Sequence, residues 1–184
     1  MKAALIALVA LALPSMALAA PPQWTVDKAM SKLTFSGTVS GQGFTGSFRN
    51  WDAVIHFDPK DLAHSDVAAT IEMGSFVTGN ADRDALLPDE DWFWVSRFPR
   101  ASFVAHGFQS VGPGRYQTTG ALTIKGVAKP LTLPFTLAIS GPTARMAGQV
   151  VLNRLAFNVG QGDWQATDTV AAAVTVGVAL TAHR

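Results

Sequence analysis

The chain has no cysteine among its 184 residues. It therefore contains neither disulfide bonds nor a thiolate metal site, and burial and backbone pairing must stabilise it. It also lacks a Gly-x-Ser-x-Gly nucleophile elbow and a glycine-rich phosphate loop between a strand and a helix. Its four histidines, His56, His64, His106 and His183, do not have the close spacing of metal-binding pairs. These absences favour a binding protein over an enzyme, and we expect no metal or cofactor.

Long apolar runs are missing beyond the first residues. Residues 1–19 combine Lys2, an apolar stretch from Ala3 to Leu13 and small residues at Ala17 and Ala19, which is typical of a signal peptide. No later stretch approaches the roughly 20 apolar residues that a membrane-spanning helix needs. We therefore expect one exported domain at residues 20–184, without a transmembrane segment. The lack of cysteine in an exported chain suits the bacterial periplasm.

Neither sign of charge dominates the predicted mature chain. Removing Lys2 from the 14 basic residues leaves 13, which equals the number of acidic residues. This balance argues against a broad surface for nucleic acid or for an anionic membrane.

In much of residues 20–184, apolar residues alternate with polar or small ones, with a period of two. In residues 131–140, leucine, phenylalanine or isoleucine occupies every second position, as in a strand with one buried face. With a shorter strand at 121–125 and a turn at 126–129, this stretch predicts a β-hairpin. Strand-like runs occur at 23–27, 31–39, 48–58, 66–76, 101–111, 116–125, 131–140, 143–152 and 169–182. Eight or more strands with short links predict a sandwich or a barrel.

The last predicted strand, residues 169–182, has two apolar faces. Valine or leucine fills most positions of one face, whereas alanine, glycine and threonine fill the other. A face of small side chains predicts either a closely packed helix or a partly empty lumen. The second alternative would leave room for a long, thin ligand.

Residues 79–100 break the strand rhythm. Asn80 is a favourable helix N-cap, acidic residues follow in the first turn, and Pro88 ends or kinks the helix. Three consecutive aromatic residues, Trp92, Phe93 and Trp94, come next. Leaving such side chains in water costs about 1.5–3 kcal/mol each, so this segment must cover an opening or enter the core. A lid over a ligand cavity and a plug that merely closes one barrel end both remain open.

Three arginines, Arg83, Arg97 and Arg100, flank this aromatic cluster. One of them is a candidate contact for an anionic head group beside an apolar channel. The alternative is that Arg83 pairs with Asp84 or Asp91 and that Arg100 is solvated.

Several stretches together resemble the YceI-like family of exported polyisoprenoid-binding proteins. They are Trp24–Asp27, Ser31–Phe35, Gly43–Phe48, Ser75–Phe103, Gly120–Gly126 and Lys129–Leu133. The resemblance implies an all-β fold, an antiparallel lipocalin-like β-barrel of about eight strands with a short helical and aromatic insertion. It departs from the family where Met30 replaces a frequent histidine and Trp94 a frequent aspartate.

The resemblance also implies a ligand and partners. The barrel interior would hold an isoprenoid lipid, such as a polyprenyl lipid or a quinone tail, or a related amphiphilic lipid. A b-type cytochrome of the inner membrane is an implied partner, a homodimer is possible, and no nucleic acid is expected. No catalytic residues are carried over.

The sequence therefore predicts a periplasmic lipid-binding barrel with a cavity lined mainly by large apolar residues. The predicted ligand-binding residues are Phe35, Phe44, Phe76, Arg83, Leu86, Trp92, Phe93, Phe103, Leu122, Phe135 and Leu137. One alternative is a secreted enzyme acting on a lipid or quinone, which needs two titratable side chains close together in the pocket. Another is a structural or stress-response periplasmic protein with a filled core.

Overall fold

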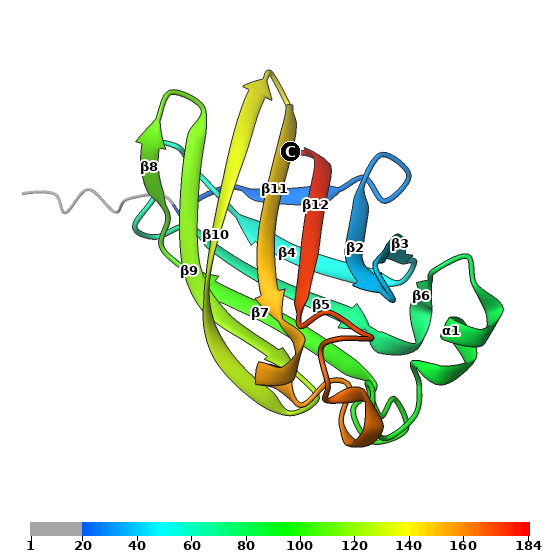
Figure 1. Ribbon diagram of the computed structural model, residues 1–184. Helices are drawn as coiled ribbons and strands as arrows, with labels where there is room; N and C mark the ends of the chain where they lie inside the picture. Colours follow the sequence, from blue (N-terminus) through cyan, green and yellow to red (C-terminus); the bar gives the residue numbers. More distant parts are fainter. Residues whose placement is uncertain (1–19) are drawn as a thin grey trace, which may run out of the picture.

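The computed structural model describes residues 20–184, so the predicted signal peptide at residues 1–19 lies outside the described residues. Twelve strands form one sheet in which the paired strands are antiparallel (Figure 1). The strands are β1 (Gln23–Val26), β2 (Lys32–Val39), β3 (Gln42–Phe48), β4 (Trp51–His56), β5 (Asp66–Glu72), β6 (Phe76–Val77), β7 (Arg100–His106), β8 (Gln109–Gly112), β9 (Arg115–Ile124), β10 (Val127–Ser140), β11 (Thr143–Asn153) and β12 (Ala173–His183). One α-helix, α1 (Ala81–Leu86), and the 3₁₀ turns η1 (Met73–Ser75), η2 (Arg154–Phe157) and η3 (Gly162–Trp164) complete the described part.

Eight of the strands close into a barrel in the order β1-β4-β5-β7-β9-β10-β11-β12, and β12 pairs back with β1. Closure removes the free edges that an open sheet would present. The predicted antiparallel, lipocalin-like barrel of about eight strands is therefore confirmed. Strands β2, β3 and β6 extend the sheet beyond β12, on the side where α1 lies (Figure 1).

Strands β1 and β2 are two parts of one interrupted strand, because both pair with β12. The turn between them contains Lys28, whose ammonium group donates to the carbonyl oxygen of Trp51 and, at 2.8 Å, to the carboxylate of Asp52. This hydrogen bond lowers the pKa of the Asp52 carboxyl below its usual value. Lys28 thus links this turn to the first residues of β4, which do not pair with β1.

Three expectations about the strands need correction. Residues 42–47 belong to a strand, β3, that the sequence did not predict, and residues 101–111 divide into β7 and β8. The turn between β9 and β10 is also tighter than expected, because Lys125 and Gly126 alone connect the two strands. Both residues have positive φ angles, 50° and 74°, as a two-residue hairpin turn of this kind requires.

The small face of β12 also has a different role from the two that were expected. The bulky face lines the interior of the barrel, from Val174 to Ala182. The small face therefore points away from the lumen. At Gly177, a Cβ atom would lie 2.8 Å from the hydroxyl of Thr34 on the neighbouring strand β2, so the small residue allows these strands to pack closely.

Helix α1 begins as its sequence predicts. The Asn80 side chain accepts a hydrogen bond from the Arg83 backbone N–H at 2.9 Å, which caps the helix. Asp84 turns back and accepts from the backbone N–H and the hydroxyl of Thr78. These bonds fix the point at which the chain leaves β6 and enters the insertion.

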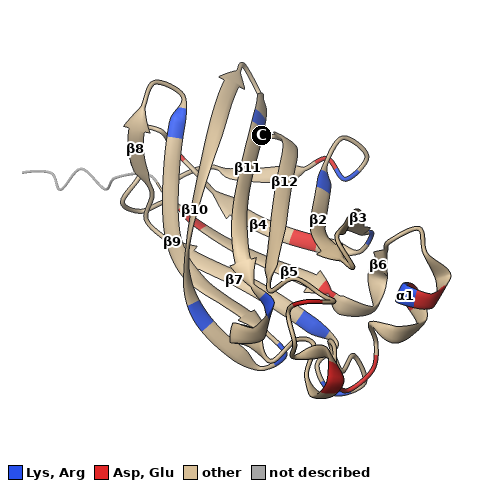
Figure 2. Ribbon diagram, in the orientation of Figure 1, with Lys and Arg blue, Asp and Glu red and all other residues tan. Residues whose placement is uncertain are grey.

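Charge is unevenly distributed over the molecule. Figure 2 shows isolated lysines and arginines on the strands; acidic residues also occur on β4 and β5, and others lie on α1 and in the loops near it. None of the helices formed by residues 20–184 has the length and apolarity needed to cross a membrane.

Close contact between β7 and β9 requires glycine at position 120. A Cβ atom there would clash with the carbonyl oxygen of Val104 and lie 2.6 Å from the Ala105 Cβ. We expect Gly120→Ala to lower the free energy of unfolding by about 1–3 kcal/mol, measured by urea denaturation. Gly43→Ala is the matched control, because a Cβ at Gly43 meets nothing within 4 Å, and its effect should stay within about 0.5 kcal/mol. Equal effects of the two substitutions would contradict this account.

Candidate functional site

A cavity of about 290 Å³ lies inside the barrel. Alternate residues of the strands point into it, as the period of a strand requires. Strand β10 contributes Leu131, Leu133, Phe135 and Leu137, and β12 contributes Val174, Val176, Val178, Leu180 and Ala182. The surface that the wall presents to the cavity is entirely apolar. A wall of this kind favours hydrocarbon and offers nothing to a polar ligand group.

The barrel is hollow along much of its length. Inward-facing side chains such as Leu133 and Val176 are only half-buried. They keep exposed surface because the lumen in front of them is not filled by other side chains. A core filled by the protein's own residues, on which the structural alternative depended, is not what the described residues form.

The cavity is elongated. The lining residues of β12 run from Val174 to Ala182, which is about 26 Å along the strand at roughly 3.3 Å per residue. Strands in barrels tilt by about 35–45° from the axis, so these residues cover about 20 Å of axial length. This shape suits a slender chain better than a compact ligand.

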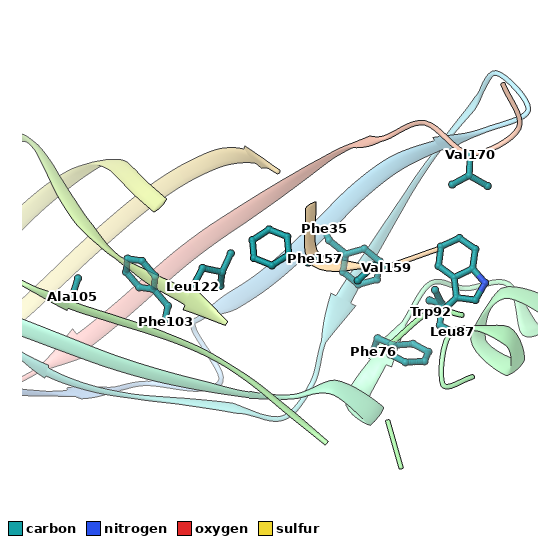
Figure 3. Packing of buried hydrophobic residues seen from close by; sticks show 10 residues of the cluster. All are labelled: Phe35, Phe76, Leu87, Trp92, Phe103, Ala105, Leu122, Phe157, Val159 and Val170. Atoms are coloured by element: carbon teal, nitrogen blue, oxygen red, sulfur yellow. The ribbon is translucent and has the colours of Figure 1, made fainter. Parts of the chain in front are cut away.

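The end of the lumen near α1 is closed by two chain segments, residues 78–99 and 154–172. In Figure 3, Trp92 and Leu87 lie beyond Phe157 and Val159, together with Val170 and Phe76. The Trp92 ring lies 5.5 Å from the Trp164 ring, so the two segments pack against each other. The aromatic segment thus acts as a plug in this structure, although its neighbour Phe93 lines the cavity.

Polar bonds join the same two segments. The Lys125 ammonium group donates to the carbonyl oxygens of Glu90 and Asn158, at 2.6 and 2.7 Å. Burial is the main cause that lowers the pKa of Lys125. In addition, the carbonyl oxygen of Asp91 accepts from the backbone N–H groups of Gly160 and Gln161. The hairpin turn between β9 and β10 therefore holds both segments in place.

Arg154 organises the second of these segments. It is buried, and its guanidinium donates five hydrogen bonds to backbone carbonyl oxygens. The acceptors are Ala171, Val159, Gly160, Trp164 and Val170. Burial lowers the pKa of Arg154. Because a guanidinium has five N–H donors, none is left for a ligand, and Arg154 serves to fix the loop that closes the barrel.

An aromatic cluster lies at the opposite part of the lumen, and its members Trp24, Phe57, Phe108 and Phe135 line the cavity. The Phe57 ring makes edge contacts with Phe108 and Tyr116, and Tyr116 stacks on Phe135 at 5.7 Å. Trp24 lies beside them, and its indole N–H donates to the carbonyl oxygen of Phe57 at 2.9 Å. This polar group is therefore satisfied within the wall.

The structure brings six of the predicted ligand-binding residues together around the cavity. They are Phe35, Phe93, Phe103, Leu122, Phe135 and Leu137. The other five do not line it. Phe76 and Trp92 are buried in the plug cluster, which consists of Phe76, Leu87, Trp92 and Val170. Phe44 and Leu86 pack against the buried core that contains this cluster, and Arg83 lies over the Phe44 ring at 4.0 Å. Ligand contact by any of the eleven stays a prediction.

Other lining residues were not among the predicted ligand-binding residues. Trp51, Ala53 and Ile55 of β4, and Phe57 just after it, occupy alternate positions and face the lumen. Arg154 had no comparable signal, because a single arginine after a strand is usually exposed. Four lining residues have side-chain nitrogen or oxygen atoms, Trp24, Trp51, Thr118 and Arg154, and Arg154 alone among the described lining residues is charged. The described lining thus lacks the pair of adjacent titratable side chains that an enzyme acting on a lipid would need.

Solved structures of similar proteins have the same fold. Burkholderia cenocepacia BcnA is 35% identical, with a TM-score of 0.82 over 85% of this chain and 98% of BcnA. A polyisoprenoid-binding domain from Saccharophagus degradans, implicated in plant cell wall breakdown, is 13% identical, with a TM-score of 0.70 over 87% of this chain and 97% of that domain. The second likeness concerns the fold alone.

Sequence comparison identifies the family. A UPF0312 protein of Pseudomonas savastanoi pv. phaseolicola is 29% identical over 116 residues, which are 61% of this chain. The match spans about 60% of the length of that relative. The YceI-like domain matches residues 24–182, which include all twelve strands apart from the ends of the first and last. The chain therefore belongs to the family of YceI-like domains.

Proposed function

We propose that this protein binds a long-chain isoprenoid lipid, a polyprenyl lipid or a quinone tail, inside its barrel. The observation that carries the proposal is the elongated cavity with an entirely apolar surface. Each methylene group that leaves water for such a cavity contributes about 0.8 kcal/mol, so a long tail gains affinity through its length. The Saccharophagus domain, described as polyisoprenoid-binding, supports the proposal through a barrel of the same fold.

We place this binding in the periplasm, on the basis of the signal-peptide pattern at residues 1–19 and the absence of cysteine. A b-type cytochrome of the inner membrane and a second copy of this chain are the proposed partners. Family resemblance supports the cytochrome. A carrier of this kind would shield an apolar tail from water between membranes.

Mass spectrometry of an organic extract tests the proposal directly. We expect protein purified from its host without detergent to yield an isoprenoid lipid in stoichiometric amount, because a tail of this kind leaves the cavity only at the cost of hydrating it. Protein from which the lipid has been stripped should take up added polyprenol again. A barrel that repeatedly yields no lipid and does not take up polyprenol would overturn the assignment.

Phe93 and Trp92 should respond differently to truncation, although they are adjacent. Phe93 faces the cavity, so Phe93→Ala should reduce lipid retention more than it lowers the melting temperature. Trp92 is buried in the plug cluster, so Trp92→Ala should chiefly lower stability, by about 3–5 kcal/mol. Extracted lipid and thermal unfolding are the two measurements.

Val151→Ala is the control for both variants, because Val151 lies on the outside of β11 with 63% of its surface exposed. It should change neither lipid retention nor the melting temperature appreciably. Lipid retention that is unchanged in Phe93→Ala would remove this residue from the binding site.

A further inference from the structure

The wall of the lumen offers no hydrogen bond to a ligand. We propose that the site therefore selects its ligand by the hydrocarbon tail alone, and that any polar head group stays outside the enclosed part of the barrel. This inference rests on the proposed function and specifies the class of ligand. That class comprises amphiphiles of varied head group whose tail carries no polar substituent over the enclosed length.

Four lining residues have side-chain nitrogen or oxygen atoms: Trp24, Trp51, Thr118 and Arg154. The Trp24 indole N–H donates to the carbonyl oxygen of Phe57, and neither indole nitrogen contributes to the cavity surface, which is apolar. Thr118 is the third of these residues. Its residue surface is only 3% exposed, and its hydroxyl donates to the carbonyl oxygen of Gly107 at 2.7 Å. The oxygen does not contribute to the cavity surface, which is apolar throughout. Thr118 therefore meets the lumen through carbon and gives a ligand no polar contact.

Arg154 is the fourth of these residues. Its five N–H donors all bind backbone carbonyl oxygens of the loop behind it, and its guanidinium lies near the Trp92 ring, 5.7 Å from the ring centroid. The oxygens of five carbonyl dipoles surround the positive charge. A ligand carboxylate or phosphate would have to displace some of these bonds to reach the guanidinium, and nothing would replace them at the carbonyl groups.

The backbone of the wall offers no polar group either. In β12, residues 175–179 are paired on one side with β11 and on the other with β2. β9 is likewise paired with β10 and, at residues 120–123, with β7. Backbone donors and acceptors in these stretches are used within the sheet and lie between strands instead of facing the lumen.

A polar substituent on the enclosed tail would therefore lose its water and gain no partner. An unpaired hydroxyl in an apolar site lowers affinity by about 10- to 100-fold. A change of head group outside the lumen has no such cost. The site therefore discriminates strongly against polar substituents on the tail and only weakly between head groups.

A matched set of diterpenoid ligands tests this inference on the stripped, full mature chain. The probes are geranylgeraniol, geranylgeranoic acid and an analogue of geranylgeraniol with a second hydroxyl at the far end of its tail. Dissociation constants measured by displacement of a fluorescent fatty acid should agree within about threefold for the alcohol and the acid. The analogue with the second hydroxyl should bind at least about tenfold more weakly than geranylgeraniol.

A variant that supplies the missing partner sharpens the test. Leu133 faces the lumen opposite Thr118 on β9, so Leu133→Gln places an amide inside the cavity. It should reduce the preference for geranylgeraniol over the doubly hydroxylated analogue. Thr132→Gln, on the outer face of the same strand, should leave that preference unchanged.

The outcomes distinguish failure of tail-only selection from failure of lipid binding itself. Equal affinity for geranylgeraniol and the doubly hydroxylated analogue in the unaltered protein, or a tenfold difference between the alcohol and the acid, would overturn tail-only selection while lipid binding stands. Failure of all three probes to bind would overturn the proposed function itself. The comparison in the unaltered protein decides the inference even where Leu133→Gln does not fold.

Discussion

The pairing of β1 with β12 is the constraint on which the rest of the structure depends. It joins Thr25 to His183 and Val26 to Ala182, and these few residues turn an open sheet into a ring. Once the ring is closed, the backbone polar groups of the paired stretches are used between neighbouring strands. The inner surface is then left to side chains, and because those side chains are apolar, the lumen is apolar as well. Closure is thus the origin of both the cavity and its chemistry.

A hollow barrel lacks the contacts that side chains would make across a filled core. Some side chains of the lumen, such as Leu133 and Val176, are only half-buried. The fully buried apolar residues form two clusters, one that includes Trp92 and Phe157 and one that includes Trp24 and Phe57, and part of each cluster also lines the lumen. The first cluster is reinforced by polar tethers from Lys125 and Arg154. Cluster members that do not line the cavity, such as Trp92 and Leu87, therefore contribute packing without occupying the lumen.

The fold was largely predictable from the sequence, and the limits of the cavity were not. Alternation identified most strands, including β10, but β3 escaped because glycines interrupt its pattern. Gly46 is one of them, and it is required because the Phe35 ring lies where its side chain would be. Apolar residues of the lumen and of the plug look alike in sequence, so Phe93 and Trp92 could be separated only by the coordinates. The role of Arg154 depends on five carbonyl groups that folding alone brings together.

The two ends of the barrel differ in how well their polar groups and backbone are accommodated. At the aromatic end, the Trp24 indole N–H has an acceptor, the carbonyl oxygen of Phe57. At the α1 end, the buried indole N–H of Trp92 has no partner within residues 20–184, and Trp94 adopts a positive φ of 47°. An unpaired buried donor costs about 1–3 kcal/mol, and a strained backbone of this kind adds a cost of similar size. Both penalties fall on the segment that closes the lumen near α1, so the polar groups and the backbone of this end are accommodated less well than those of the aromatic end.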